Sequence, residues 1–237
     1  MISETILLGI LGIGLFAYLL IAGVTALQVY SMSKAGLQTD PTAPEAPAIP
    51  ARWAAENEFG FLGTYRMKTP MTRALIYAWQ RTDRPTYFCT YIIQSGQETK
   101  ESYDLVTVFG DDIGLTTSST KDGHMFPKPP HCFIQSFSPS VFDDRWARHI
   151  EMENYLMDVG GAQLVEREDV FEELIIDAMR KQMDYVRGIS LWFLRAPIWF
   201  FIRRSQWHNL SIEEQYRKRL IKLPKEIGRS LIQNPKY

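Results

Sequence analysis

The sequence predicts an α+β protein with a single N-terminal transmembrane helix, a Pro-rich linker, an antiparallel β-meander of four to five strands, and packed helices after the meander. Three observations lead to this class: residues 6–27 form one long apolar run, proline is concentrated just after it, and strand-like segments give way to helical periodicity near residue 138. The expected boundaries are 1–34 for the transmembrane anchor, 35–52 for the linker, 53–188 for an α+β head and 189–237 for an aromatic and basic helical tail. Without anchor and linker, about 180 residues remain, which is the size of one ordinary domain.

The anchor is predicted from the absence of charge. No Asp, Glu, Lys or Arg lies between Glu4 and Lys34. A helix over residues 6–27 would be about 30 Å long, which matches the hydrocarbon core of a bilayer. A cleaved signal peptide is the alternative, but the segment lacks a basic start and its apolar run is longer than such peptides carry. We therefore expect a retained, single-pass helix in the lipid bilayer.

Small residues give this helix a candidate packing surface. They fall near one stripe, and such stripes let two helices approach closely in lipid; they are Gly9, Gly12, Gly23 and Ala26. Glycine is also generally frequent in transmembrane helices, so composition alone is the competing explanation. Lys34 and Arg52 follow the apolar run whereas only Glu4 precedes it, which by the positive-inside rule predicts a cytoplasmic head.

Between the anchor and the head, residues 39–50 read TDPTAPEAPAIP. Four prolines without apolar periodicity predict an extended, polyproline-like spacer with a reach of roughly 35 Å. The head then offers strand-like segments separated by turn-forming residues. They are 73–80, 86–94, 103–109, 113–118 and 132–137. Strands and helices do not alternate in this half, which argues against a doubly wound nucleotide-binding sheet.

Helical patterns occupy the second half. The first helix is expected from Ser138 to the Gly160–Gly161 pair, and the second from Glu168 to Arg187. The apolar stripe of the second helix recurs every three or four residues, so it should cover the sheet. A third helix is expected to begin at a capping box formed by Ser211 and Glu214.

The segment 189–202 is apolar but too short to span a bilayer, and Arg195 and Pro197 interrupt it. Aromatic and guanidinium side chains together are typical of a membrane interface. The candidates are Trp192, Arg195, Trp199, Arg203, Arg204 and Trp207. A buried core helix or a protein contact is the alternative. From residue 195 onward, ten Lys or Arg face three Glu, which favours anionic lipid as a partner; a nucleic-acid partner is not expected, since no fold signature for one accompanies the charge.

Signs of chemistry are sparse. The sequence contains no phosphate-binding loop, nucleophile elbow or zinc-protease motif, and its two cysteines belong to no paired motif, so we expect no cofactor. Residues able to ligate a metal do gather around one predicted loop: His124, His131, Asp111 and Asp112. Their spacing matches no standard site, and a plain strand connection is the ordinary explanation. His149 is expected to be a hydrogen-bonded packing residue.

These observations leave three hypotheses for function. The first is a non-catalytic accessory or scaffold subunit of a membrane assembly, whose partner is another membrane protein or a second copy of the chain. The second is a membrane-tethered, metal-dependent hydrolase that uses the histidines and aspartates just named. The third is a module that binds anionic lipid through its tail. A small-molecule substrate cannot be inferred from the residues.

Overall fold

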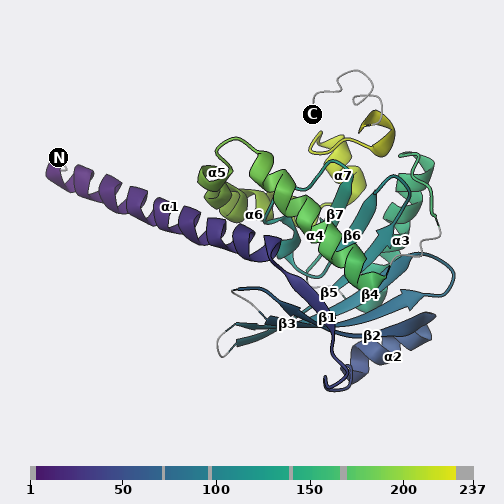
Figure 1. Cartoon of the computed structure of the whole chain (residues 1–237). Helices are drawn as coiled ribbons and strands as arrows, with labels where there is room; N and C mark the ends of the chain where they lie inside the picture. The colour runs from purple at the N-terminus through teal and green to yellow at the C-terminus, as the bar shows by residue number, and fades with distance from the viewer. Residues whose placement is uncertain (1–3, 71–72, 96–97, 139–140, 166–169, 228–237) are drawn as a thin grey trace.

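The computed structural model describes residues 4–70, 73–95, 98–138, 141–165 and 170–227. A long helix, α1 (Glu4–Ser33), projects from a head built on one mixed sheet with helices on both of its faces (Figure 1). The molecule is therefore α+β, as the sequence predicts, and α1 is long and apolar enough to cross a membrane.

The sheet has seven strands whose spatial order follows the chain. They are β1 (Gly36–Thr39), β2 (Phe59–Lys68), β3 (Arg73–Arg81), β4 (Thr86–Ser95), β5 (Glu98–Val108), β6 (Gly114–Ser118) and β7 (Cys132–Ser136). All five predicted strands are confirmed, as β3 to β7. Two strands were missed, β1 and β2.

The last pair of strands corrects the expectation of a purely antiparallel meander. Each strand up to β6 pairs antiparallel with the next, but β6 and β7 run parallel. A parallel pair needs a crossover of about a dozen residues, and the segment 119–131 supplies it with a short 3-10 helix, η1 (Lys121–His124), and three prolines. This crossover holds both predicted metal-ligating histidines.

Both faces of the sheet are covered, so its central strands are apolar on both sides. On β3, Tyr77 and Trp79 face one cluster of buried residues whereas Ile76 and Ala78 face another. The first cluster includes residues of α2 (Ala48–Glu56) and α3 (Phe142–Asp158), and the second includes residues of α4 (Phe171–Gly188). The predicted packing of α4 on the sheet is confirmed by Phe171, which is buried against Tyr65.

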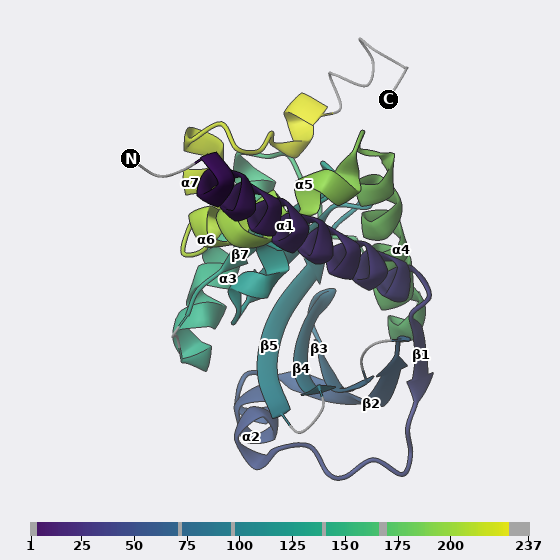
Figure 2. The same ribbon diagram turned by 90° about the vertical axis from the view of Figure 1, so that its left-hand side faces the viewer.

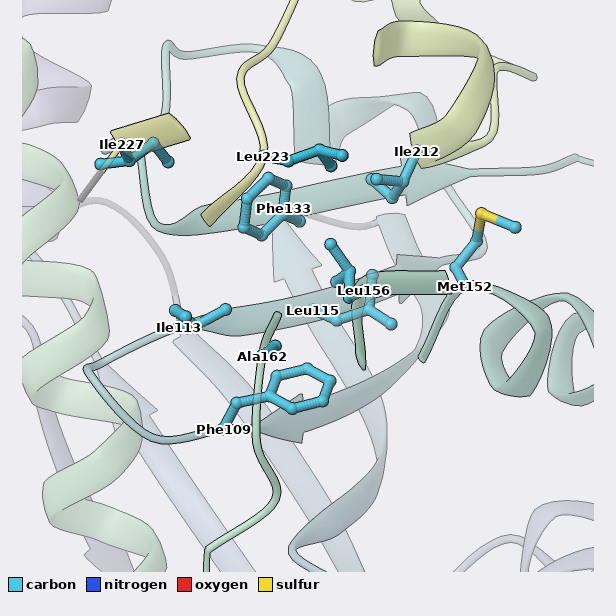
Figure 3. Packing of buried hydrophobic residues seen from close by; sticks show 10 residues of the cluster. All are labelled: Phe109, Ile113, Leu115, Phe133, Met152, Leu156, Ala162, Ile212, Leu223 and Ile227. Carbon is cyan, nitrogen blue, oxygen red and sulfur yellow. The ribbon is translucent and has the colours of Figure 1, made fainter. Parts of the chain in front are cut away.

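A third cluster joins the end of the sheet to α3 and to the tail. Figure 3 shows Leu115 and Phe133 of β6 and β7 facing Leu156 of α3. Ile212 and Leu223 of the tail complete this cluster, and both are fully buried. Helix α7 (Ile212–Arg217) begins at the predicted capping box, in which the Ser211 side chain accepts from the Glu214 amide. Residues 211–227 of the tail are thus part of the folded head.

The extended spacer expected over residues 39–50 is not confirmed. Residues Gly36–Thr39 form the edge strand β1 on β2, and α2 begins at Ala48 within the proline-rich stretch. The coil between β1 and α2 is also bound to the sheet. Arg66 of β2 forms an ion pair with Asp40, and the Tyr77 hydroxyl of β3 donates to the Pro44 carbonyl at 3.2 Å. Helix α1 therefore leads into the sheet after only two residues.

The remaining helices lie beside the anchor. After α4 come α5 (Trp192–Ile198), a π-helical turn η2 (Trp199–Arg203) and α6 (Arg204–Trp207). Figure 2 shows α1 crossing in front of the upper end of the curved sheet, with α4 and α5 next to it. The anchor and the head are consequently packed against each other.

Candidate functional site

The junction between α1 and the head is one candidate functional region. Along α1, Ala22, Thr25 and Val29 are buried at the spacing of one helical face, and this face turns toward the head. Val29 packs with Phe126 and with residues of α4, and the cluster also touches Trp192 and Trp199. One stripe of the predicted transmembrane helix is thereby occupied by the protein itself.

Further toward the N-terminus, α5 lies along α1. The Tyr18 hydroxyl donates a hydrogen bond to the main-chain carbonyl of Leu194. Because Tyr18 is near the middle of the apolar run, this contact places α5 beside the apolar part of α1 rather than beyond its end. The segment 189–203 therefore packs along α1.

The rest of α1 is exposed, including most of the predicted small-residue stripe. Gly9, Gly12 and Gly23 are exposed, and a Cβ added at any of them would meet nothing within 4 Å among the described residues. Ala26 is half-buried at the edge of the face that packs on the head. Three of the four predicted packing residues thus remain open to a partner, and their role stays a prediction.

The predicted membrane-interface residues point in several directions. Trp192 and Trp199 are half-buried in the junction, and Trp207 is only 9% exposed. Arg203 stacks on Trp207 with its guanidinium carbon 3.7 Å from the ring centroid, and Arg204 pairs with Asp122 at 2.9 Å. Arg195 is exposed.

A different set of side chains forms the outer surface of this segment. They are large, apolar and exposed: Leu191, Phe193, Ile198, Phe201 and Ile202. The sequence-based prediction of a membrane interface rested on composition and therefore named the tryptophans and arginines instead. The spacing of Leu191, Ile198 and Ile202, seven and then four residues apart, would have identified the exposed face.

The predicted metal ligands are dispersed. His124 is buried beside Trp207, with ring centroids 6.1 Å apart, whereas Asp112 pairs with Lys181 at 2.9 Å. Asp111 and Asp112 both have positive φ, which the turn before β6 requires. His131 is half-buried next to Cys132. Within the ranges that the structure describes, no three His, Cys, Asp or Glu residues gather closely enough to hold a metal.

His149 is the centre of a buried polar network between α3 and the sheet. Its Nε2 lies 2.9 Å from Thr107 Oγ1, and its Nδ1 lies 2.8 Å from Thr117 Oγ1. Thr107 also donates to Glu153, whose second oxygen accepts from Arg84 at 3.0 Å. Both ring nitrogens are thus satisfied, which confirms the prediction of a packing histidine.

The chemistry of this network is restricted by its burial. His149 and Glu153 are fully buried, and burial lowers the pKa of His149 to about 3, so the imidazole is neutral near pH 7. None of the cavities found among the described residues is lined by either side chain. The network ties α3 to the sheet and offers a substrate no access.

The most developed cavity lies elsewhere, and we call it the basic cavity. Its volume is about 710 Å³, and it is enclosed by the crossover before β7, the C-terminal part of α4, η2, α6 and the tail around α7. Its described lining contains no carboxylate but four cationic side chains, which are Lys128, Arg203, Arg219 and Lys222. Sequence analysis missed this cavity because its walls come from four separate segments.

Burial affects the cations of the basic cavity strongly. The pKa of Lys128 is lowered to about 8, chiefly by burial; Cys132 and Asp104 act against this shift, and Arg203 contributes to it. Burial also lowers the pKa of Arg203 to about 10. Lys128 and Arg203 are therefore two neighbouring cations that are largely shielded from water, which favours the binding of an anion between them.

Comparisons with known proteins add no assignment: no family model, no curated protein and no solved structure matches this chain.

Proposed function

We propose that this chain is a single-pass, membrane-anchored accessory or scaffold subunit of a membrane protein assembly, without catalytic activity. The observation that carries the proposal is the packing of the head along its own α1, through α5 and the contact between Tyr18 and Leu194. A flexible tether would leave the orientation of the head free. The packed junction instead fixes the head relative to the helix.

The depth of α5 supports this role. A bilayer core of about 30 Å takes about 20 helical residues, so a span that begins at Ile6 ends near Thr25. Tyr18 then lies about 10 Å inside the hydrocarbon region, counted at 1.5 Å per residue. The exposed apolar side chains of α5 and η2 continue the apolar surface of α1 at that depth, where lipid would solvate them.

The free surface of α1 is the proposed contact for a partner helix. Gly9, Gly12 and Gly23 lie on it, away from the stripe that packs on the head. Small residues allow helix backbones to approach closely in lipid. We propose that the partner is another membrane protein or a second copy of this chain, and that the head faces the cytoplasm because Lys34 follows the span.

The absence of catalysis is proposed from the state of the polar groups. The densest cluster of titratable side chains, around His149, is closed to solvent and internally satisfied. The described residues that could bind a metal are separated. A scaffold role requires no reaction at the His149 network and no metal at the separated residues.

The test is purification of the full chain from membranes in a mild detergent. We expect the protein to resist extraction at alkaline pH and to elute with stoichiometric partners or as an oligomer, above the 27.4 kDa of one chain. Gly12→Leu should release the partner, because the added side chain fills the close-approach surface. Gly14→Leu is the matched control, since Gly14 is equally open but lies on the opposite side of α1.

Two outcomes would remove the proposal. Release of the chain by alkaline washing would show that α1 does not anchor it. A monomer that neither substitution alters would show that the glycine surface has no partner.

A further inference from the structure

We propose that the basic cavity binds a phosphate group, and that its source is the headgroup of an anionic phospholipid at the membrane surface. The inference rests on the proposed anchoring only for that source. The site itself stands on the arrangement of the folded head.

Charge is the first reason. Lys128 of the crossover and Arg203 of η2 both line the cavity, together with Arg219 and Lys222 of the tail. None of these four cations has a carboxylate partner at ion-pair distance among the described residues. Asp104 attracts Lys128 but is not part of the described lining. A negatively charged ligand would neutralise the four cations.

Buried nitrogens without a hydrogen-bond partner are the second reason. Arg203 Nε and His131 Nδ1 are both buried without a hydrogen-bond partner in the described structure, and both residues line the cavity. A buried nitrogen left unpaired is costly, and such exceptions call for an acceptor. The guanidinium plane of Arg203 is held against Trp207, so its N–H groups have a fixed direction. Arginine in a fixed orientation is well suited to phosphate oxygens.

The position of the cavity is the third reason. Arg203 follows Trp199 by one helical turn, and Trp199 packs in the same cluster as Val29 near the end of α1. A span that ends near Thr25 puts Val29 about 6 Å beyond the hydrocarbon, which is the depth of lipid headgroups. Basic pockets beside membrane helices on the cytoplasmic side are a known way to hold anionic headgroups.

The walls argue for a lipid over a small anion. Between the cations, the cavity is lined by proline and aliphatic side chains, among them Pro129, Leu220 and Ile221. A free phosphate ion would leave these apolar groups without a partner, whereas the glycerol and first acyl carbons of a phospholipid would cover them.

The experiment titrates the full chain, purified in a non-ionic detergent, by calorimetry with three probes. They are dihexanoyl phosphatidylglycerol, dihexanoyl phosphatidylcholine with the same acyl chains but no net charge, and inorganic phosphate. We expect saturable binding of phosphatidylglycerol, at least tenfold tighter than that of either other probe. Inorganic phosphate binding as tightly as phosphatidylglycerol would overturn the lipid source, and no saturable binding of any probe would overturn the site.

Substitutions locate the binding. Lys128→Gln and Arg203→Gln should each weaken phosphatidylglycerol binding at least tenfold, since a hydrogen bond to a charged group is lost. Lys222→Gln at the exposed rim should weaken it severalfold and keeps the test open if a buried variant fails to fold. Lys218→Gln is the matched control, because Lys218 is exposed on the same part of the tail but does not line the cavity. An equal loss in the Lys218 variant would mean diffuse attraction to the basic tail and would overturn the cavity assignment.

Failure of the proposed function would look different. A chain that washes off membranes yet binds phosphate through Lys128 and Arg203 would defeat the anchoring and keep the site. An anchored chain with no anion binding would defeat only the site.

Discussion

The hydroxyl group of Tyr18 is hydrogen-bonded to the main-chain carbonyl of Leu194, which follows it by 176 residues. Helix α1 and the α5 segment, which lie far apart in the sequence, thus meet beside the middle of α1. Because the contact couples a predicted transmembrane helix to the segment after α4, it determines how the head is held.

Removing this hydroxyl should loosen α5 without unfolding the head. Tyr18→Phe keeps the ring but leaves the Leu194 carbonyl without this donor, at a cost of about 1 kcal/mol. We expect faster amide hydrogen exchange in residues 189–203 of the detergent-solubilised protein, with the sheet unchanged. Tyr30→Phe is the control, since Tyr30 is exposed at the end of α1. Unchanged exchange in the Tyr18 variant would show that the bond does not hold α5.

The proposed depth of α5 and η2 predicts protection by lipid. Single cysteines at Ile198 and Phe201, in a background with both Cys89→Ala and Cys132→Ala, should resist a membrane-impermeant maleimide in sealed, head-outward membranes. Both side chains are about half exposed in the chain itself, so only lipid would shield them. A cysteine at Lys218 should react, because that position is exposed on the tail. Rapid labelling at Ile198 in sealed, head-outward membranes would place α5 in water.

The His149 network predicts a dependence of stability on acid. Burial holds the folded pKa at about 3, below the ordinary value of 6.5, so the unfolded chain takes up a proton that the folded chain refuses. This contribution to stability is complete above pH 6.5 and is lost as the pH falls toward 3. The loss approaches about 1.4 kcal/mol per pH unit.

His149→Gln should flatten that dependence. Chemical unfolding followed by tryptophan fluorescence at pH 7, 6 and 5 would measure it. Part of the slope should remain, because burial also lowers the pKa of His124 to about 3. An identical slope in the variant and the parent would show that His149 is not neutral and buried in the folded protein.

The elements predicted correctly from the sequence are those with a clear local signal in their side chains or at their ends. The strands β3 and β4 are flanked by turn residues and rich in aromatic and β-branched side chains, and α7 has a capping box. β2 was missed because Gly60 and Gly63 suggest a loop, although the register shift between Phe61 and Gly63 shows a bulge inside a strand.

Tertiary contacts explain the other differences. β1 has four residues and little strand character, and it forms because it can pair with the free edge of β2. The basic cavity could not have been predicted, because Lys128 and Arg203 are distant in sequence and meet only after the crossover and η2 have packed. Long-range packing of this kind leaves no local pattern.

Helix α2, which begins among the residues expected to be a spacer and continues into the head, gives the last prediction. Trp53 of α2 is 7% exposed and packs against Phe88 and Phe142, and its indole N–H donates to Asp143 at 2.7 Å. If α2 belongs to the fold, Trp53→Ala should destabilise the head by about 3–5 kcal/mol, the usual cost of removing a buried tryptophan. Arg52→Ala on the same helix should change stability by less than about 0.5 kcal/mol, because its side chain is 74% exposed. Chemical unfolding of both variants measures the difference, and equally small effects would show that α2 does not pack on the sheet.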